Sequence, residues 1–297
     1  MAFKRASQTA NPDVDSDDDV PPPLEVLEPG VARALSPMVR RIIAPNAGVM
    51  TGPGTNTYLI GIDEVAVVDP GPADEGHLDA ILGCGGDRIR WVALTHHHLD
   101  HAPGAMALCE RTGAELIAFD RRDGVRPDRK MADGDRIEAT EFRLKAIHTP
   151  GHCSDHLCYL LEEERMLLTG DHIMEGSTVV IHPPDGDMAD YLASLDKVRK
   201  LRLKTIAPGH GRLIENPFEV IDWYIAHRLE REAKVMEAIT DAGTAKVDQL
   251  VPVVYADVSP DLYPVARHSL HAHLLKLAGD GRVEGRTLTG KWSVVGA

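Results

Sequence analysis

The chain has 297 residues, enough for one core domain of about 200 residues and a smaller second domain. Apolar residues make up 43% and charged residues 26% of it, as in ordinary globular proteins, and no run approaches the roughly 18 apolar residues of a membrane span. The formal net charge of −14 repels polyanions and anionic membrane surfaces. Composition therefore excludes a transmembrane protein and a generally basic nucleic-acid binder.

The first 30 residues hold seven acidic and two basic residues, and three prolines follow the run DSDDDV. Such a segment buries too little apolar surface to order itself, so residues 1–30 are predicted to be a disordered acidic tail. Its start contains no apolar stretch of the kind that forms a secretory signal, and the four cysteines are too few for a disulfide scaffold. A reducing, cytoplasmic location without membrane contact is expected.

Residues 31–216 alternate short runs of Val, Ile and Leu with turn clusters, which predicts an α/β core domain. The expected strands are Asn56–Ile62, Val65–Asp69, Arg90–Thr95, Glu115–Phe119, Phe142–Ile147, Leu157–Leu161, Met166–Thr169 and Lys204–Ala207. The expected helices are Leu78–Leu82, Ala105–Arg111 and Met188–Leu201.

Residues 217–297 are predicted to form a helical linker and a winged-helix-like domain. Apolar residues at helical spacing indicate a long helix over Pro217–Ala242 and shorter ones over Lys246–Tyr255 and Tyr263–Ala278. A β-hairpin turning at Thr289 and Gly290 is expected to follow, although a three-helix cap fits the pattern equally well. Residues 228–297 carry nine basic and nine acidic side chains, which disfavours a DNA-reading wing.

The motif THHHLDH, at the end of the apolar run IRWVAL, is the strongest chemical signal in the chain. Three further strand ends carry HTPGH, TGDH and PGHG, so four strand-to-loop junctions each supply imidazole or carboxylate groups. Loops at one edge of a sandwich converge, and imidazole with carboxylate favours zinc, or less often iron or manganese. The residues expected to bind metal are His96, His98, Asp100, His101, His152, Asp171 and His210.

These ligands divide into two groups, which predicts a binuclear site for two divalent cations, with zinc as the expected metal. The first ion would be held by His96, His98 and His152, and the second by Asp100, His101 and His210. Asp171 is expected to bridge them, and Asp100 and Asp171 are the expected catalytic residues. Two cations about 4 Å apart lower the pKa of a shared water and polarise a bound carbonyl or phosphoryl oxygen. Hydrolysis is the implied reaction.

Any one of these histidines alone would more often be an ordinary polar side chain, and only the joint pattern points to metal. Alternation along the motif turns His97 away from the site, and Cys153 is a weak candidate for a soft ligand. His156 is a candidate for orienting a metal ligand. The segment GTNTY, residues 54–58, fits either a substrate contact or a structured turn.

The four motifs, in this order, resemble those of the metallo-β-lactamase fold, and the chain from Val39 to Val295 resembles the lactamase-beta-like endoribonuclease group within it. The segments APNAGVMTGPGTNTYLIG, HTPGHCSDHLCYLL and YPVARHSLHAHLLKLAGDGRVEG carry the closer resemblance. The resemblance implies an αββα sandwich followed by a winged-helix-like domain, and its metal ligands fall on the same seven residues.

The resemblance implies hydrolysis of single-stranded RNA by a hydroxide activated at the metal site. The alternative is a thioesterase acting on acyl thioesters, like glyoxalase II or the acyl-carrier thioesterases of this fold. Charge disfavours RNA, because residues 31–227 carry a net charge of −9, although two cations supply positive charge locally. The expected partner is a small-molecule or single-stranded RNA substrate, and the sequence does not predict an oligomeric state.

Overall fold

The computed structural model describes residues 26–296. The predicted acidic tail lies outside the described residues except for its last five. Within those five, Pro29 forms an isolated bridge with Ile43, and the amide of Gly30 donates to the carbonyl of Ile43.

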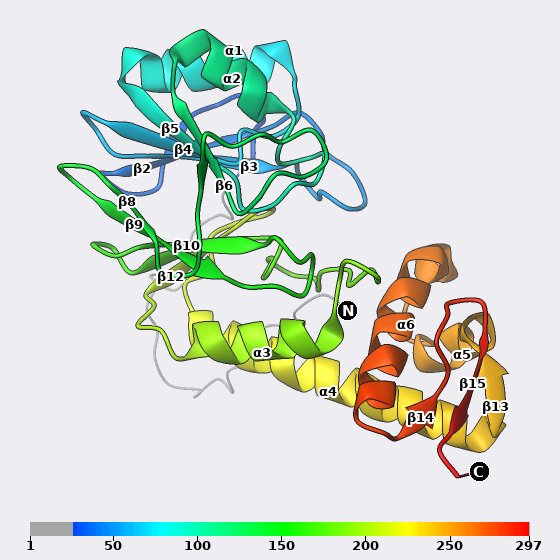
Figure 1. The fold of residues 1–297 in the computed structure, drawn as a ribbon. Coiled ribbons are helices and arrows are strands. Elements are labelled where there is room, and N and C mark those ends of the chain that lie inside the picture. The colour runs from blue at the N-terminus through cyan, green and yellow to red at the C-terminus, as the bar shows by residue number, and fades with distance from the viewer. Residues whose placement is uncertain (1–25, 297) are drawn as a thin grey trace, which may run out of the picture.

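Two sheets face each other in the larger part of the molecule (Figure 1). The first sheet has the order β1-β2-β3-β4-β5-β6-β7, with strands Arg33–Ala34, Val39–Ile43, Asn56–Ile60, Val65–Val68, Ile89–Ala93, Glu115–Ala118 and Arg129–Lys130. The second has the order β12-β11-β10-β9-β8, with strands Thr205–Pro208, Met166–Gly170, Leu157–Leu161, Arg143–His148 and Arg136–Glu138. Both sheets are mixed, because β4 to β7 and the pair β11-β12 run parallel while the other neighbours are antiparallel.

Helices cover the outer face of each sheet. Helices α1, Glu75–Gly85, and α2, Gly104–Thr112, pack on the first sheet, with the short 3-10 turn η1, Gly86–Arg88, after α1. Helices α3, Met188–Arg199, and α4, Pro217–Ala242, pack on the second (Figure 1). The layers are therefore αββα, and the fold class expected from the sequence is confirmed. Within residues 26–296, no helix combines the length and apolarity that crossing a membrane requires.

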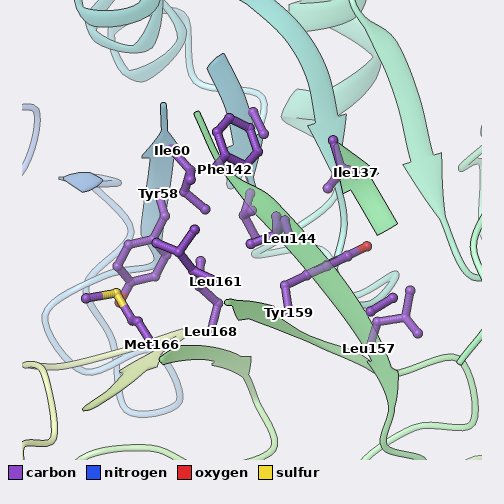
Figure 2. Packing of buried hydrophobic residues seen from close by; sticks show 14 of the residues in the cluster. Tyr58, Ile60, Ile137, Phe142, Leu144, Leu157, Tyr159, Leu161, Met166 and Leu168 are labelled. Atoms are coloured by element: carbon purple, nitrogen blue, oxygen red, sulfur yellow. The ribbon is translucent and has the colours of Figure 1, made fainter. Parts of the chain in front are cut away.

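The main core lies between the two sheets. Figure 2 shows side chains from β3 and from β9 to β11 interleaved there, among them Tyr58, Leu144, Tyr159 and Leu168. These four are at most 2% exposed, because alternate residues of each strand face the partner sheet. These contacts pack the two sheets against each other, and the loops at their common edge therefore start from buried, well-packed strands.

The C-terminal part contains α4, α5, Val247–Val254, the 3-10 turn η2, Pro260–Leu262, and α6, Tyr263–Gly279. A three-stranded sheet of order β13-β15-β14 closes it, with strands Thr244–Lys246, Lys291–Val294 and Val283–Glu284. Trp292 of β15 is fully buried among residues of the helices. The predicted hairpin is present as β14 and β15, and the three-helix cap without strands is wrong.

Several element boundaries differ from the sequence expectation for identifiable reasons. Helix α1 begins three residues early, because the Asp74 side chain caps the amide of His77 at 2.8 Å. Lys246 belongs to β13, not to a helix, since pairing with Lys291 holds it extended. Strand β2 was not expected as a separate element, although its residues Val39–Ile43 pair along β3.

Candidate metal centre

All seven predicted ligands meet at one edge of the sandwich. They follow the carboxyl ends of four strands, of which β5 belongs to the first sheet and β9, β11 and β12 belong to the second. The residues arrive from loops whose supporting strands are buried, so their positions are set by the packed core. Their nitrogen and oxygen atoms form two adjacent groups.

The first group consists of His96, His98 and His152. Nδ1 of His98 lies 3.1 Å from Nε2 of His96 and 3.0 Å from Nε2 of His152. Zinc at about 2.1 Å from each of three nitrogens would hold those nitrogens roughly 3.3 Å apart. The spacing of the three imidazoles therefore suits a shared cation.

The second group consists of Asp100, His101, Asp171 and His210. Oδ1 of Asp171 lies 3.3 Å from Nε2 of both His101 and His210, and Oδ2 of Asp100 lies 3.4 and 3.2 Å from the same two nitrogens. The other oxygen of Asp171 lies 3.8 Å from Nε2 of His152 in the first group. Asp171 therefore stands between the two groups, in the place expected for a bridging carboxylate.

Each of four imidazoles is held by a contact on its other nitrogen, so that Nε2 faces the site. Nδ1 of His152 donates to the carbonyl of Val180 at 2.7 Å, and Nδ1 of His210 donates to the carbonyl of Gly54 at 3.2 Å. Nδ1 of His96 contacts Oγ1 of Thr95 at 2.9 Å. These contacts fix the tautomer that leaves the Nε2 lone pair available to a cation.

Asp69 supports the fourth imidazole, and sequence reasoning missed it. Its Oδ2 lies 2.9 Å from Nδ1 of His101, and its carboxylate also accepts from the amide and hydroxyl of Thr95 at 2.7 and 2.6 Å. Asp69 follows β4 with φ of 50°, a left-handed conformation uncommon for a residue with a side chain. The turn sequence DPGP, which begins at the last residue of the predicted strand, was the only signal.

The two groups differ in charge. Burial lowers the pKa of His96 well below its usual range, and burial together with the neighbouring His152 lowers that of His98 to about 4. Burial also opposes charge on His101 and His210, but the surrounding carboxylates outweigh it and raise the pKa of His101 well above its usual value and that of His210 to about 9. The second group is therefore a site that favours positive charge.

Buried polar atoms in the second group fit a cation. Within residues 26–296, Nε2 of His101, Nε2 of His210 and Oδ1 of Asp171 are buried without a hydrogen-bond partner. Such atoms are costly unless something compensates them. A divalent cation accepts lone pairs from all three, so the donor set fits the predicted metal.

The other singled-out residues lie around this centre. His97 turns away, and its Nδ1 lies 2.8 Å from Oδ1 of Asp155, near the buried Cys153. The ring of His156 packs 5.2 Å from that of His96 and contacts Oγ1 of Thr149. Residues 55–57 are fully buried and bonded internally, and Asn56 and Thr57 belong to β3, which argues against a substrate contact.

A cavity of about 670 Å³ opens onto the centre and extends to the C-terminal part. His98, Asp100, His152 and Asp171 line one end of it, and α4 and α6 line the other. Its size lies within the range of about 300 to 1,000 Å³ typical of small-molecule sites.

Comparison with known proteins identifies the family. The sequence of residues 50–210 matches the family model of the metallo-beta-lactamase superfamily, and that of residues 247–292 matches the family model of the beta-lactamase associated winged helix domain. The chain belongs to the metallo-β-lactamase superfamily. This metallo-β-lactamase superfamily protein is a metallo-hydrolase with a winged helix domain, and its His/Asp cluster is a candidate site for divalent metal ions.

Relatives of this superfamily protein span nearly its whole length. A beta-lactamase-like protein 2 homolog of Caenorhabditis elegans is 32% identical over 89% of this chain and 91% of its own. An atrochrysone carboxyl ACP thioesterase of Aspergillus chevalieri is 31% identical over 93% of this chain and 91% of its own. A beta-lactamase domain protein of Burkholderia ambifaria shares the fold, with a TM-score of 0.77, 18% identity and coverage of 92% and 96%.

Proposed function

We propose that the protein is a thioesterase that hydrolyses acyl thioesters with two divalent cations, zinc being the expected metal. The ligands would be His96, His98 and His152 for one ion and Asp100, His101 and His210 for the other, with Asp171 between them. Bound cations supply Lewis-acid polarisation of a carbonyl oxygen and lower the pKa of water. The thioesterase among the relatives supports this choice of substrate class.

An acyl thioester is favoured over RNA as the substrate because the arginines that line the cavity already have partners within the protein. Arg122 pairs with Asp185 at 2.9 Å, Arg228 donates to the carbonyl of Val179 at 2.5 Å, and Arg231 pairs with Asp257. Among the described lining residues, none is a lysine. RNA affinity depends on cations that neutralise phosphates, whereas an acyl thioester carries no charge at its carbonyl.

Asp100 has a defined part in this proposal. Burial would raise the pKa of Asp100, but His101 and His210 hold it below its usual range, so the carboxylate stays ionised. It lines the cavity and lies 3.2 Å from Nε2 of His210. Asp100 therefore presents acceptor oxygens to water entering from the cavity, beside the place where the substrate carbonyl would lie.

The test is a paired assay of the metal-loaded protein with single-stranded RNA and with acyl thioesters of N-acetylcysteamine. Thioester hydrolysis with RNA left intact is the expected result, while RNA cleavage without thioester hydrolysis would restore the endoribonuclease prediction. Asp100→Asn should abolish turnover with the fold intact, since the amide lacks the charge. The control Asp87→Asn changes an exposed residue away from the cavity and should leave turnover unchanged.

A further inference from the structure

The end of the cavity away from Asp100 and Asp171 is rich in apolar side chains, and the C-terminal part supplies most of them. Asp100 and Asp171 lie at one end, and the side chains from α4, from the segment after α5 and from α6 lie at the other. The apolar and aromatic residues that the C-terminal part contributes to this wall are Trp223, Tyr255, Val258, Leu262, Val265 and Ala266. A molecule whose reacting atoms reach the metal centre would therefore extend toward the winged helix domain.

The wall is fixed to the core by specific contacts. The amide of Ile181, on the loop between β11 and α3, donates to Oγ of Ser269 on α6 at 3.2 Å. Arg228 of α4 reaches the carbonyl of Val179 on the same loop. The loop that contributes Val179 and Val180 is thereby tied to α4 and α6, so both sides of the cavity are in place before a ligand enters.

Two of the basic groups in the wall carry no unpaired positive charge, because Arg231 is paired and His227 is neutral. Both terminal nitrogens of Arg231 contact the carboxylate of Asp257, at 2.8 and 3.1 Å, and its guanidinium lies 4.4 Å from the centre of the Tyr255 ring. Burial lowers the pKa of His227 to about 4, so its imidazole is neutral at pH 7. A ligand in this part of the cavity meets mostly apolar side chains and aromatic rings, beside the polar groups of Arg228, Arg231 and Ser269.

We infer that this apolar wall is the acyl-binding subsite, and that the winged helix domain selects thioesters with long or bulky acyl groups. The inference rests on the proposed thioesterase function and adds to it the place and the chemical class of the acyl group. An acetyl group would leave most of a 670 Å³ cavity unfilled. Each buried methylene is expected to raise kcat/KM by about fourfold until the wall is covered.

The experiment measures kcat/KM of the metal-loaded protein for acetyl, butanoyl and octanoyl thioesters of N-acetylcysteamine. The wild type should prefer butanoyl over acetyl by about tenfold, and octanoyl over acetyl by at least about 100-fold. Val265→Phe and Ala266→Phe place a ring in the apolar end and should lower the octanoyl value by about tenfold while the acetyl value stays within about twofold. Val258→Ala, which adds space without crowding, should raise the octanoyl-to-acetyl ratio.

The matched control is Val253→Phe, because Val253 is 64% exposed on α5 and lies outside the cavity lining. It should leave both substrates unaffected. Equal losses for acetyl and octanoyl in the two phenylalanine variants, or an unchanged ratio in all three lining variants, would overturn the subsite. If the wild type hydrolyses none of the thioesters, the proposed function itself fails, so the two failures are distinguishable.

Discussion

Nδ1 of His101 donates to Oδ2 of Asp69 at 2.9 Å, and both side chains are almost completely buried. The bond orients the imidazole so that Nε2 faces Asp100 and Asp171. Because Thr95 donates twice to the same carboxylate, the turn after β4 and the end of β5 are tied together directly behind the metal centre. A residue that contacts no cation thus sets the position of one that would.

Asp69→Asn should weaken metal binding by about 10- to 100-fold, the usual effect of losing a carboxylate behind a ligating imidazole. The amide can present its NH₂ group to His101 and thereby disturb the tautomer. Metal affinity can be measured by competition with a chromophoric chelator, with Asp87→Asn as the exposed control. Wild-type affinity in the Asp69 variant would show that the bond does not support the ligand.

The protein should contain about two equivalents of zinc or a similar metal by elemental analysis. Exhaustive chelation should abolish hydrolysis, and added zinc should restore it, because the seven side chains form two groups that could each hold a cation. Full activity in a preparation shown to be free of metal would contradict the centre as described.

Gly209→Ala should lower metal content and activity with little change in secondary structure. A Cβ at this position would lie 2.8 Å from Oδ1 of Asp171 and 2.9 Å from Cε1 of His101, so the methyl group would push the ligands apart. The control is Gly83→Ala on α1, where a Cβ has open space and alanine favours the helix. Metal analysis and circular dichroism of both variants would separate the two effects.

The buried His77 should lower the free energy of unfolding as the pH falls below about 6.5. Burial lowers the pKa of His77 to about 4. Its Nε2 contacts Oγ1 of Thr57, and its buried Nδ1 has no hydrogen-bond partner among the described residues. The unfolded chain then binds the proton more readily, so stability is present above about pH 6.5 and is lost as pH falls toward 4.

Between pH 7 and pH 5 this group should cost about 2 kcal/mol of unfolding free energy. Urea denaturation at the two pH values would measure the loss in the wild type and in His77→Gln. Because glutamine does not titrate, the variant should lose less on acidification by that amount. The same pH dependence in both proteins would assign the acid sensitivity to other groups.

The sequence predicted strands and helices at the right positions where the apolar pattern and the flanking residues indicated the same element. Leu157–Leu161 and Pro217–Ala242 match the predicted spans, because an apolar run in one case and helical spacing after Pro217 in the other were unambiguous. The extent of α1 and the short strand β13 did not follow, since the first depends on a capping side chain and the second on pairing with a distant strand.

The sequence by itself determined which residue types are predicted to bind metal and their place at strand ends, because motif spacing and strand periodicity are local properties of the chain. Only the tertiary structure brought the four loops within contact distance and placed Asp69 behind His101. It alone also showed that Arg122, Arg228 and Arg231 are already engaged and that the cavity continues into an apolar wall. Charge counts along a chain do not reveal which charges are paired, because pairing depends on residues that meet only after folding.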